Sequence, residues 1–132
     1  MRKIIVWTLL GILQLDAKEM GELYFSGNCV TCHHPVKTIS APSVVEFKKR
    51  YTNAFSDKKE FVNYMSKWVL KPTEKGSLMH DAIQKHGLMP ELGFDEETLR
   101  EIASYIYDTD FTKKGELDSL FPKKSLSNRP LH

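Results

Sequence analysis

Apolar side chains recur at helical spacing in several separate stretches of the chain, and no stretch alternates convincingly as a strand would. The clearest stretch carries one apolar stripe, made of Phe61, Val62, Met65, Trp68 and Val69. Asp57 and Glu60 provide a helix start before this stripe. Pro72 provides its end, because the residue before a proline avoids the helical region. We therefore predict a helix between Asp57 and Pro72.

Four further stretches have helical spacing and their own start or stop signals. They span residues 18–26, 43–52, 77–86 and 95–108. Gly27-Asn28 is expected to end the first of these helices, and Gly87 is a suitable C-cap for the third. Ser43 and Glu46 form a capping-box pair, and Asp95 is a good N-cap for the last helix. The pattern predicts an all-α fold of about four to five helices.

Beyond Asp108 the helical pattern fades into polar sequence. Only a short stretch near residues 116–121 favours another helix. We expect one compact domain over residues 18–108, followed by a polar C-terminal extension over residues 109–132.

The N-terminal segment has the parts of a secretory signal peptide. Arg2 and Lys3 form a basic start, a largely apolar run follows from Ile4 to Leu13, and Ala17 offers a cleavage position. The run is too short to cross a bilayer comfortably, since spanning takes ~20 residues. We expect residues 1–17 to be removed on export, which gives a periplasmic protein without membrane insertion. An uncleaved N-terminal anchor is the alternative.

The charge balance argues against a nucleic-acid partner. The 132 residues include 19 Lys and Arg and 17 Asp and Glu, so the formal net charge is only +2. Such a small excess does not provide the basic surface that phosphate backbones require. Basic runs such as residues 48–50 fall on predicted helices, where a solvated face is the usual explanation. We expect a monomer that binds no nucleic acid.

The candidate chemistry lies in Cys29-Val30-Thr31-Cys32-His33, which contains the two cysteines of the chain. Cys-x-x-Cys-His is the attachment signature of covalently bound c-type haem. Each cysteine sulfur adds to one vinyl group of the porphyrin, and the adjacent imidazole of His33 can bind the iron. A thiol–disulfide redox pair would usually need a βαβ context, which the pattern does not predict.

The opposite face of the iron has several candidate ligands. Met89 precedes Pro90, which favours an extended backbone, so a non-helical loop can bring its thioether to the iron. Met79 falls in a predicted helix, where packing in the core is an adequate explanation. His86, His80 and an open site are further possibilities, whereas His34 follows the proximal ligand directly and cannot reach across the ring.

The free ring nitrogen of His33 also needs a partner. Metal-bound imidazoles usually donate that N–H to a carbonyl or a carboxylate, which fixes the orientation of the ring. The carbonyl of Pro42 is our candidate acceptor. The alternative is that Ala41-Pro42 only leads into the next helix.

With these residues in place, the chain resembles the small class I cytochromes c over residues 18–108. The resemblance is carried by Gly21, Phe25, Cys29-x-x-Cys32-His33, Ala41-Pro42, Met89-Pro90, and Leu99 to Ile106 with Tyr105. It implies a compact helical fold around one covalent haem, in which the first and last helices cross near Gly21 and Tyr105. It also implies that His33 and Met89 ligate the iron and that Pro42 orients His33. A tryptophan often contacts a haem propionate in this family, so Trp68 has that role or packs in the core.

These features together predict a mono-haem electron carrier that exchanges single electrons with redox protein partners. Iron held by two side chains leaves no position for a substrate, so we do not expect an enzyme. Two alternatives stay open. The chain is a haem-bearing subunit that docks on a larger redox enzyme through its extension, or it is a sensor of small gases if Met89 leaves the iron.

Overall fold

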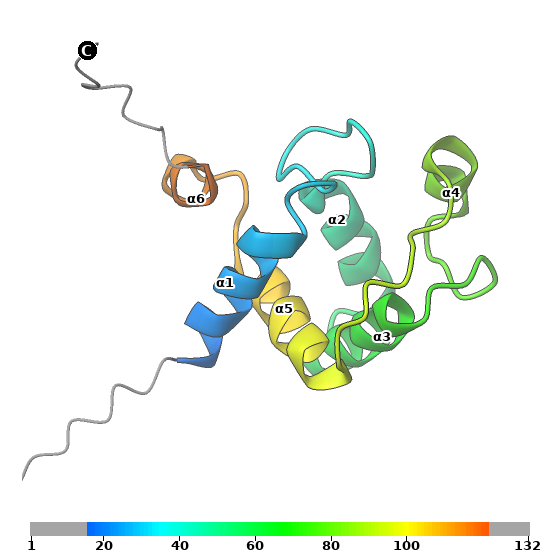
Figure 1. Cartoon of the computed structure of the whole chain (residues 1–132), viewed down its shortest axis with the longest axis horizontal. Coiled ribbons are helices and arrows are strands. Elements are labelled where there is room, and N and C mark those ends of the chain that lie inside the picture. Colours follow the sequence, from blue (N-terminus) through cyan, green and yellow to red (C-terminus); the bar gives the residue numbers. More distant parts are fainter. Residues whose placement is uncertain (1–15, 122–132) are drawn as a thin grey trace, which may run out of the picture.

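The computed structural model describes residues 16–121 and is all-helical over that range (Figure 1). Its six helices are α1 (Ala17–Asn28), α2 (Val44–Ala54), α3 (Lys58–Leu70), α4 (His80–His86), α5 (Glu96–Asp108) and α6 (Lys114–Leu120). The all-α prediction is confirmed for these residues, and α6 corresponds to the short helix that the sequence favours near residues 116–121. The predicted signal peptide, apart from Asp16 and Ala17, lies outside the described residues. Within the described part of the chain, no helix is long and apolar enough to cross a membrane.

Local capping explains where three of the helices begin. The Ser43 hydroxyl accepts the N–H of Glu46 at 3.2 Å. The carboxylate of Asp57 accepts the N–H of Glu60 at 3.2 Å, and that of Asp95 accepts the N–H of Thr98 at 2.9 Å. Each bond satisfies a backbone donor that the first helical turn leaves without a partner. The three helix starts predicted from the sequence are therefore confirmed.

The first helix ends later than its sequence suggests. We expect Gly27-Asn28 to break it, but α1 includes both residues. The side chain of Asn28 donates to the carbonyl of Tyr24 at 2.9 Å, and the N–H of Cys29 donates to the carbonyl of Phe25 at 2.8 Å. The backbone bond continues the helical pattern up to the first cysteine, and the Asn28 side chain adds a second bond to the last turn.

Helices α1 and α5 cross in close contact, as expected from Gly21 and Tyr105 (Figure 1). A Cβ added at Gly21 would lie 2.5 Å from the carbonyl oxygen of Glu101 and 2.8 Å from the Cβ of Tyr105. Glycine is required here because a larger residue would push the two helices apart.

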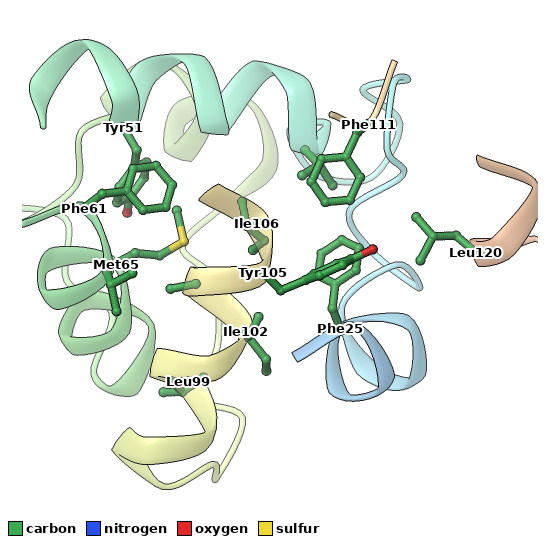
Figure 2. Close-up of a cluster of buried hydrophobic side chains, with 13 residues drawn as sticks. Phe25, Tyr51, Phe61, Met65, Leu99, Ile102, Tyr105, Ile106, Phe111 and Leu120 are labelled. Carbon is green, nitrogen blue, oxygen red and sulfur yellow. The ribbon is translucent and has the colours of Figure 1, made fainter. Parts of the chain in front are cut away.

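The core gathers around α5, whose apolar side chains lie between those of α1, α2 and α3 (Figure 2). From α5 the buried residues are Leu99, Ile102, Ala103, Tyr105 and Ile106. Phe61 and Met65 of α3 pack on one side of this helix, and Phe25 of α1 packs on the opposite side. The stripes predicted for α3 and α5 therefore meet in one core.

The chain beyond Asp108 contributes to that core, although its polar sequence suggests an extension. Phe111 is only 2% exposed, and its ring centroid lies 5.4 Å from that of Phe25. Leu120 of α6 is also buried, and the Tyr105 hydroxyl donates to a carboxylate oxygen of Glu116 at 2.9 Å. A few well-placed apolar residues in a polar segment were enough to pack it, and periodicity does not detect so sparse a pattern.

Candidate functional site

An apolar cavity is bordered by residues of α1 to α5 and of the segments between them. Its volume is about 280 Å³, close to the lower end of the roughly 300–1,000 Å³ of common small-molecule sites. Six of the residues singled out in the sequence line this cavity: Cys29, Cys32, His33, Pro42, Trp68 and Met89.

The two cysteines and His33 are held together by a tight turn at the end of α1. The N–H of Cys32 and the N–H of His33 both donate to the carbonyl of Cys29, at 3.2 and 2.9 Å. Both cysteines are free thiols; Cys29 is partly buried and Cys32 is exposed. Burial, with a smaller effect of Cys32, raises the pKa of the Cys29 thiol to about 11. Cys29 is therefore a neutral thiol at physiological pH.

His33 is oriented by the backbone of Pro42. The Nδ1 atom of His33 lies 2.7 Å from the Pro42 carbonyl oxygen, which can only accept a hydrogen bond. Nδ1 must therefore carry the ring proton, which leaves the lone pair on Nε2. The imidazole also packs edge-on against Phe47, with ring centroids 5.2 Å apart.

The electrostatics of His33 favour the neutral form that a metal needs. Burial is the main effect and lowers the pKa of His33, the hydrogen bond to Pro42 raises it, and the charge of His86 lowers it again. The result is a lowered pKa, so Nε2 is unprotonated near neutral pH and available as a ligand.

The loop that contains Pro42 is fixed by the start of α2. The N–H of Val44 donates to the carbonyl of His34 at 3.1 Å, and the N–H of Val45 donates to the carbonyl of Pro35 at 3.0 Å. These bonds fold the loop back beside the cysteine turn and bring Pro42 next to His33. They use the free donors at the N-terminus of α2, so one contact serves both the helix and the site.

The segment that carries Met89 joins α4 to α5 and borders the cavity as extended chain (Figure 1). Gly87 and Gly93 flank it with φ values of 84° and 75°, a left-handed conformation that glycine adopts most easily. Leu88 and Leu92 line the cavity but are 41% and 43% exposed. Apolar side chains placed this way would bury more surface against a flat apolar group in the cavity.

The structure places Met79 differently from the sequence-based expectation. Met79 is not inside a helix: α4 begins at His80, because the Ser77 hydroxyl accepts the N–H of Met79 at 3.0 Å. Met79 lines the cavity and is only 6% exposed, and His86 at the end of α4 also lines it. His80 does not border the cavity and is exposed.

Trp68 lines the cavity, but its indole hydrogen already has an acceptor. Nε1 donates to the carbonyl oxygen of Thr73 at 3.0 Å. Because an indole has one N–H and no acceptor, a bond from Trp68 to a bound carboxylate would require this bond to be exchanged.

Tyr51 is a site residue that sequence reasoning missed, since its spacing on α2 indicates a core position. Its side chain is 6% exposed and lines the cavity, yet no group among the described residues accepts its hydroxyl hydrogen. Burial, with a smaller effect of Tyr64, raises the pKa of Tyr51 and keeps its hydroxyl protonated. The hydroxyl is therefore free to donate to a molecule that occupies the cavity.

The donor set fits a haem in its chemistry. Thiols at the wall, one oriented imidazole and a thioether surround an apolar space, and iron in a porphyrin needs only axial ligands from the protein. Between residues 16 and 121, no three His, Cys, Asp or Glu side chains form a cluster that could hold a metal ion by themselves. Compared with known proteins, the chain matches no family description, no curated protein and no solved structure.

Proposed function

We propose that the chain is an exported mono-haem c-type cytochrome that carries single electrons between redox protein partners. The observation that carries the proposal is the convergence of Cys29, Cys32, His33 and Met89 on one apolar cavity. These residues come from two parts of the chain about sixty positions apart. A chance Cys-x-x-Cys-His sequence would have no reason to face such a cavity.

In this proposal the chain has three tasks. Cys29 and Cys32 would attach the haem covalently, and His33, oriented by Pro42, would hold the iron through Nε2. Met89 would be the second protein ligand of the iron. The Tyr51 hydroxyl would donate to a carboxylate of the haem, since no group among residues 16–121 accepts its hydrogen.

Ligation by His33 and Met89 suits electron transfer. Iron held by one imidazole and one thioether would exchange single electrons, and the neutral thioether in an apolar site would favour Fe(II) and raise the potential. The apolar lining from Leu99, Ile102 and Ile106 would keep water from the iron. Because two side chains would hold the iron, the proposed site would leave no position on the iron for a substrate. We therefore propose no enzymatic activity.

The test is a redox titration of the haem-loaded protein with its visible spectrum recorded at each potential. We expect one reversible one-electron transition between two low-spin forms, and a weak band from the Met89–iron bond near the red end of the oxidised spectrum. A high-spin spectrum at neutral pH would contradict Met89 as a firm ligand. Carbon monoxide binding to the reduced native protein would favour gas sensing over electron transfer.

A further inference from the structure

Two possible iron donors, His86 and Met89, lie within four residues of each other at the same cavity. His86 is the last residue of α4, and the N–H of Gly87 closes that helix on the carbonyl of Ile83 at 2.8 Å. The chain then changes direction at Gly87, where φ is 84°. Both side chains are partly buried, and each borders the cavity that His33 also borders.

A second imidazole borders the cavity that His33 borders. His86 is partly buried there, and its charge contributes to the lowered pKa of His33, after the larger effect of burial. The same cavity therefore holds one imidazole oriented by Pro42 and a second imidazole from the end of α4.

The backbone at Gly87 allows either donor to face the cavity. A Cβ at Gly87 would meet nothing within 4 Å, and the same is true at Gly93, so neither end of the Met89 segment is held by packing at its glycine. Two glycines with positive φ at the ends of a short extended segment are suited to absorb a change in backbone direction.

We propose that His86 is a reserve ligand, which takes the iron position of Met89 when the thioether leaves. This inference rests on the proposed function. Exchange breaks one iron–sulfur bond and forms one bond to an imidazole nitrogen of His86, with no change in the number of electrons. The soft thioether favours Fe(II), whereas imidazole is the better partner for Fe(III), so the potential is lower with His86 bound.

The reserve ligand would keep the iron six-coordinate when Met89 is lost. The site would then stay closed to small gases and stay competent for electron transfer, at a lower potential. Met79 is the competing donor because it also lines the cavity, but its backbone N–H is bonded to Ser77 and its side chain is packed in the core. The two donors differ in their spectra, because only a methionine gives the band near the red end.

The experiment compares haem-loaded variants by visible spectrum and midpoint potential. For Met89→Ala we expect a low-spin oxidised spectrum that lacks the methionine band, and a potential below that of the native protein. For the double variant with His86→Ala we expect a high-spin spectrum and rapid binding of carbon monoxide when reduced. The matched control is the double variant of Met89→Ala and His80→Ala. His80 lies on the same helix as His86 but does not border the cavity, so this double variant should resemble Met89→Ala alone.

Three results would overturn the proposal. A high-spin Met89→Ala variant would mean that no reserve ligand exists, and a retained methionine band would assign the role to Met79. Equal loss of the low-spin spectrum with His80→Ala and with His86→Ala would remove the specific role of His86. Failure of the proposed function would give a different result from failure of this inference. In that case neither the native protein nor any variant would carry covalently bound haem.

Discussion

The substitution Gly21→Ala tests the helix crossing that forms one wall of the cavity. The added Cβ would lie 2.5 Å from a backbone oxygen of Glu101 and 2.8 Å from the Cβ of Tyr105. Neither atom is the flexible end of a side chain, so α1 and α5 must separate to admit the methyl group. Overpacking of this kind costs roughly 1–3 kcal/mol, and two contacts below 3.0 Å place Gly21→Ala near the upper limit.

Part of this loss is offset, because alanine is better than glycine inside a helix by about 1 kcal/mol. We therefore expect Gly21→Ala to lower the free energy of unfolding by about 2 kcal/mol. The matched control is Gly27→Ala in the same helix, where an added Cβ meets nothing within 4 Å. Gly27→Ala should be neutral or gain up to about 1 kcal/mol.

The assay is urea unfolding of the haem-loaded protein, followed by circular dichroism in the far ultraviolet. The linear dependence of the unfolding free energy on urea gives the difference between the two alanine variants, provided that their slopes agree. If Gly21→Ala is as stable as Gly27→Ala, the close contact between α1 and α5 does not exist in solution.

Three further outcomes follow from burial and titration. Phe111→Ala should lower the unfolding free energy by about 3–5 kcal/mol in the same urea assay, because its buried ring leaves a cavity; a loss below about 1 kcal/mol would refute the packing of this segment. In the haem-free protein, iodoacetamide should modify the exposed Cys32 well before Cys29. The reason is that with a pKa of about 11 only ~0.1% of the Cys29 thiol is ionised at pH 8. Equal modification rates of the two cysteines, measured by mass spectrometry, would contradict this. The pKa values of Cys29, Tyr51 and Tyr105 are raised in the folded state, so that state holds protons that the unfolded chain releases. The contribution of Cys29 is lost as the pH rises from about 9 through about 11, and that of the two tyrosines is lost at higher pH, above their ordinary value of 10. The urea midpoint of haem-free protein should therefore fall between about pH 9 and 11, and a constant midpoint would count against this.

The parts of the fold set by local chemistry are predictable from the sequence. Helix starts at Ser43, Asp57 and Asp95 depend on one side chain that accepts an N–H two or three residues later. The apolar stripes of α3 and α5 depend only on spacing, and they meet as expected in the core.

The start of α4 shows where local signals compete. Ser77 is a plausible first residue of a helix, but its hydroxyl binds the N–H of Met79, and the helix begins only at His80. Met79 is consequently placed at the cavity, outside the helix that the sequence predicts for it. Both arrangements satisfy the pattern of apolar residues, so only the three-dimensional contacts separate them.

The parts of the site that depend on distant contacts are not predictable from the pattern. Only the fold shows that no described group accepts the Tyr51 hydroxyl hydrogen. Only the fold shows that the Trp68 indole N–H is already bonded to the Thr73 carbonyl. Phe111 packs on Phe25 from a segment without periodicity. Each case depends on which residues meet across the fold.

The most direct test of the account is the intact mass of the exported protein, produced in cells that attach haem to a reference c-type cytochrome. We predict a mass that includes one haem, which stays bound after denaturation. The haem should be absent when Cys29 and Cys32 are both replaced by alanine. A native protein without bound haem, in cells that load the reference cytochrome, would contradict it.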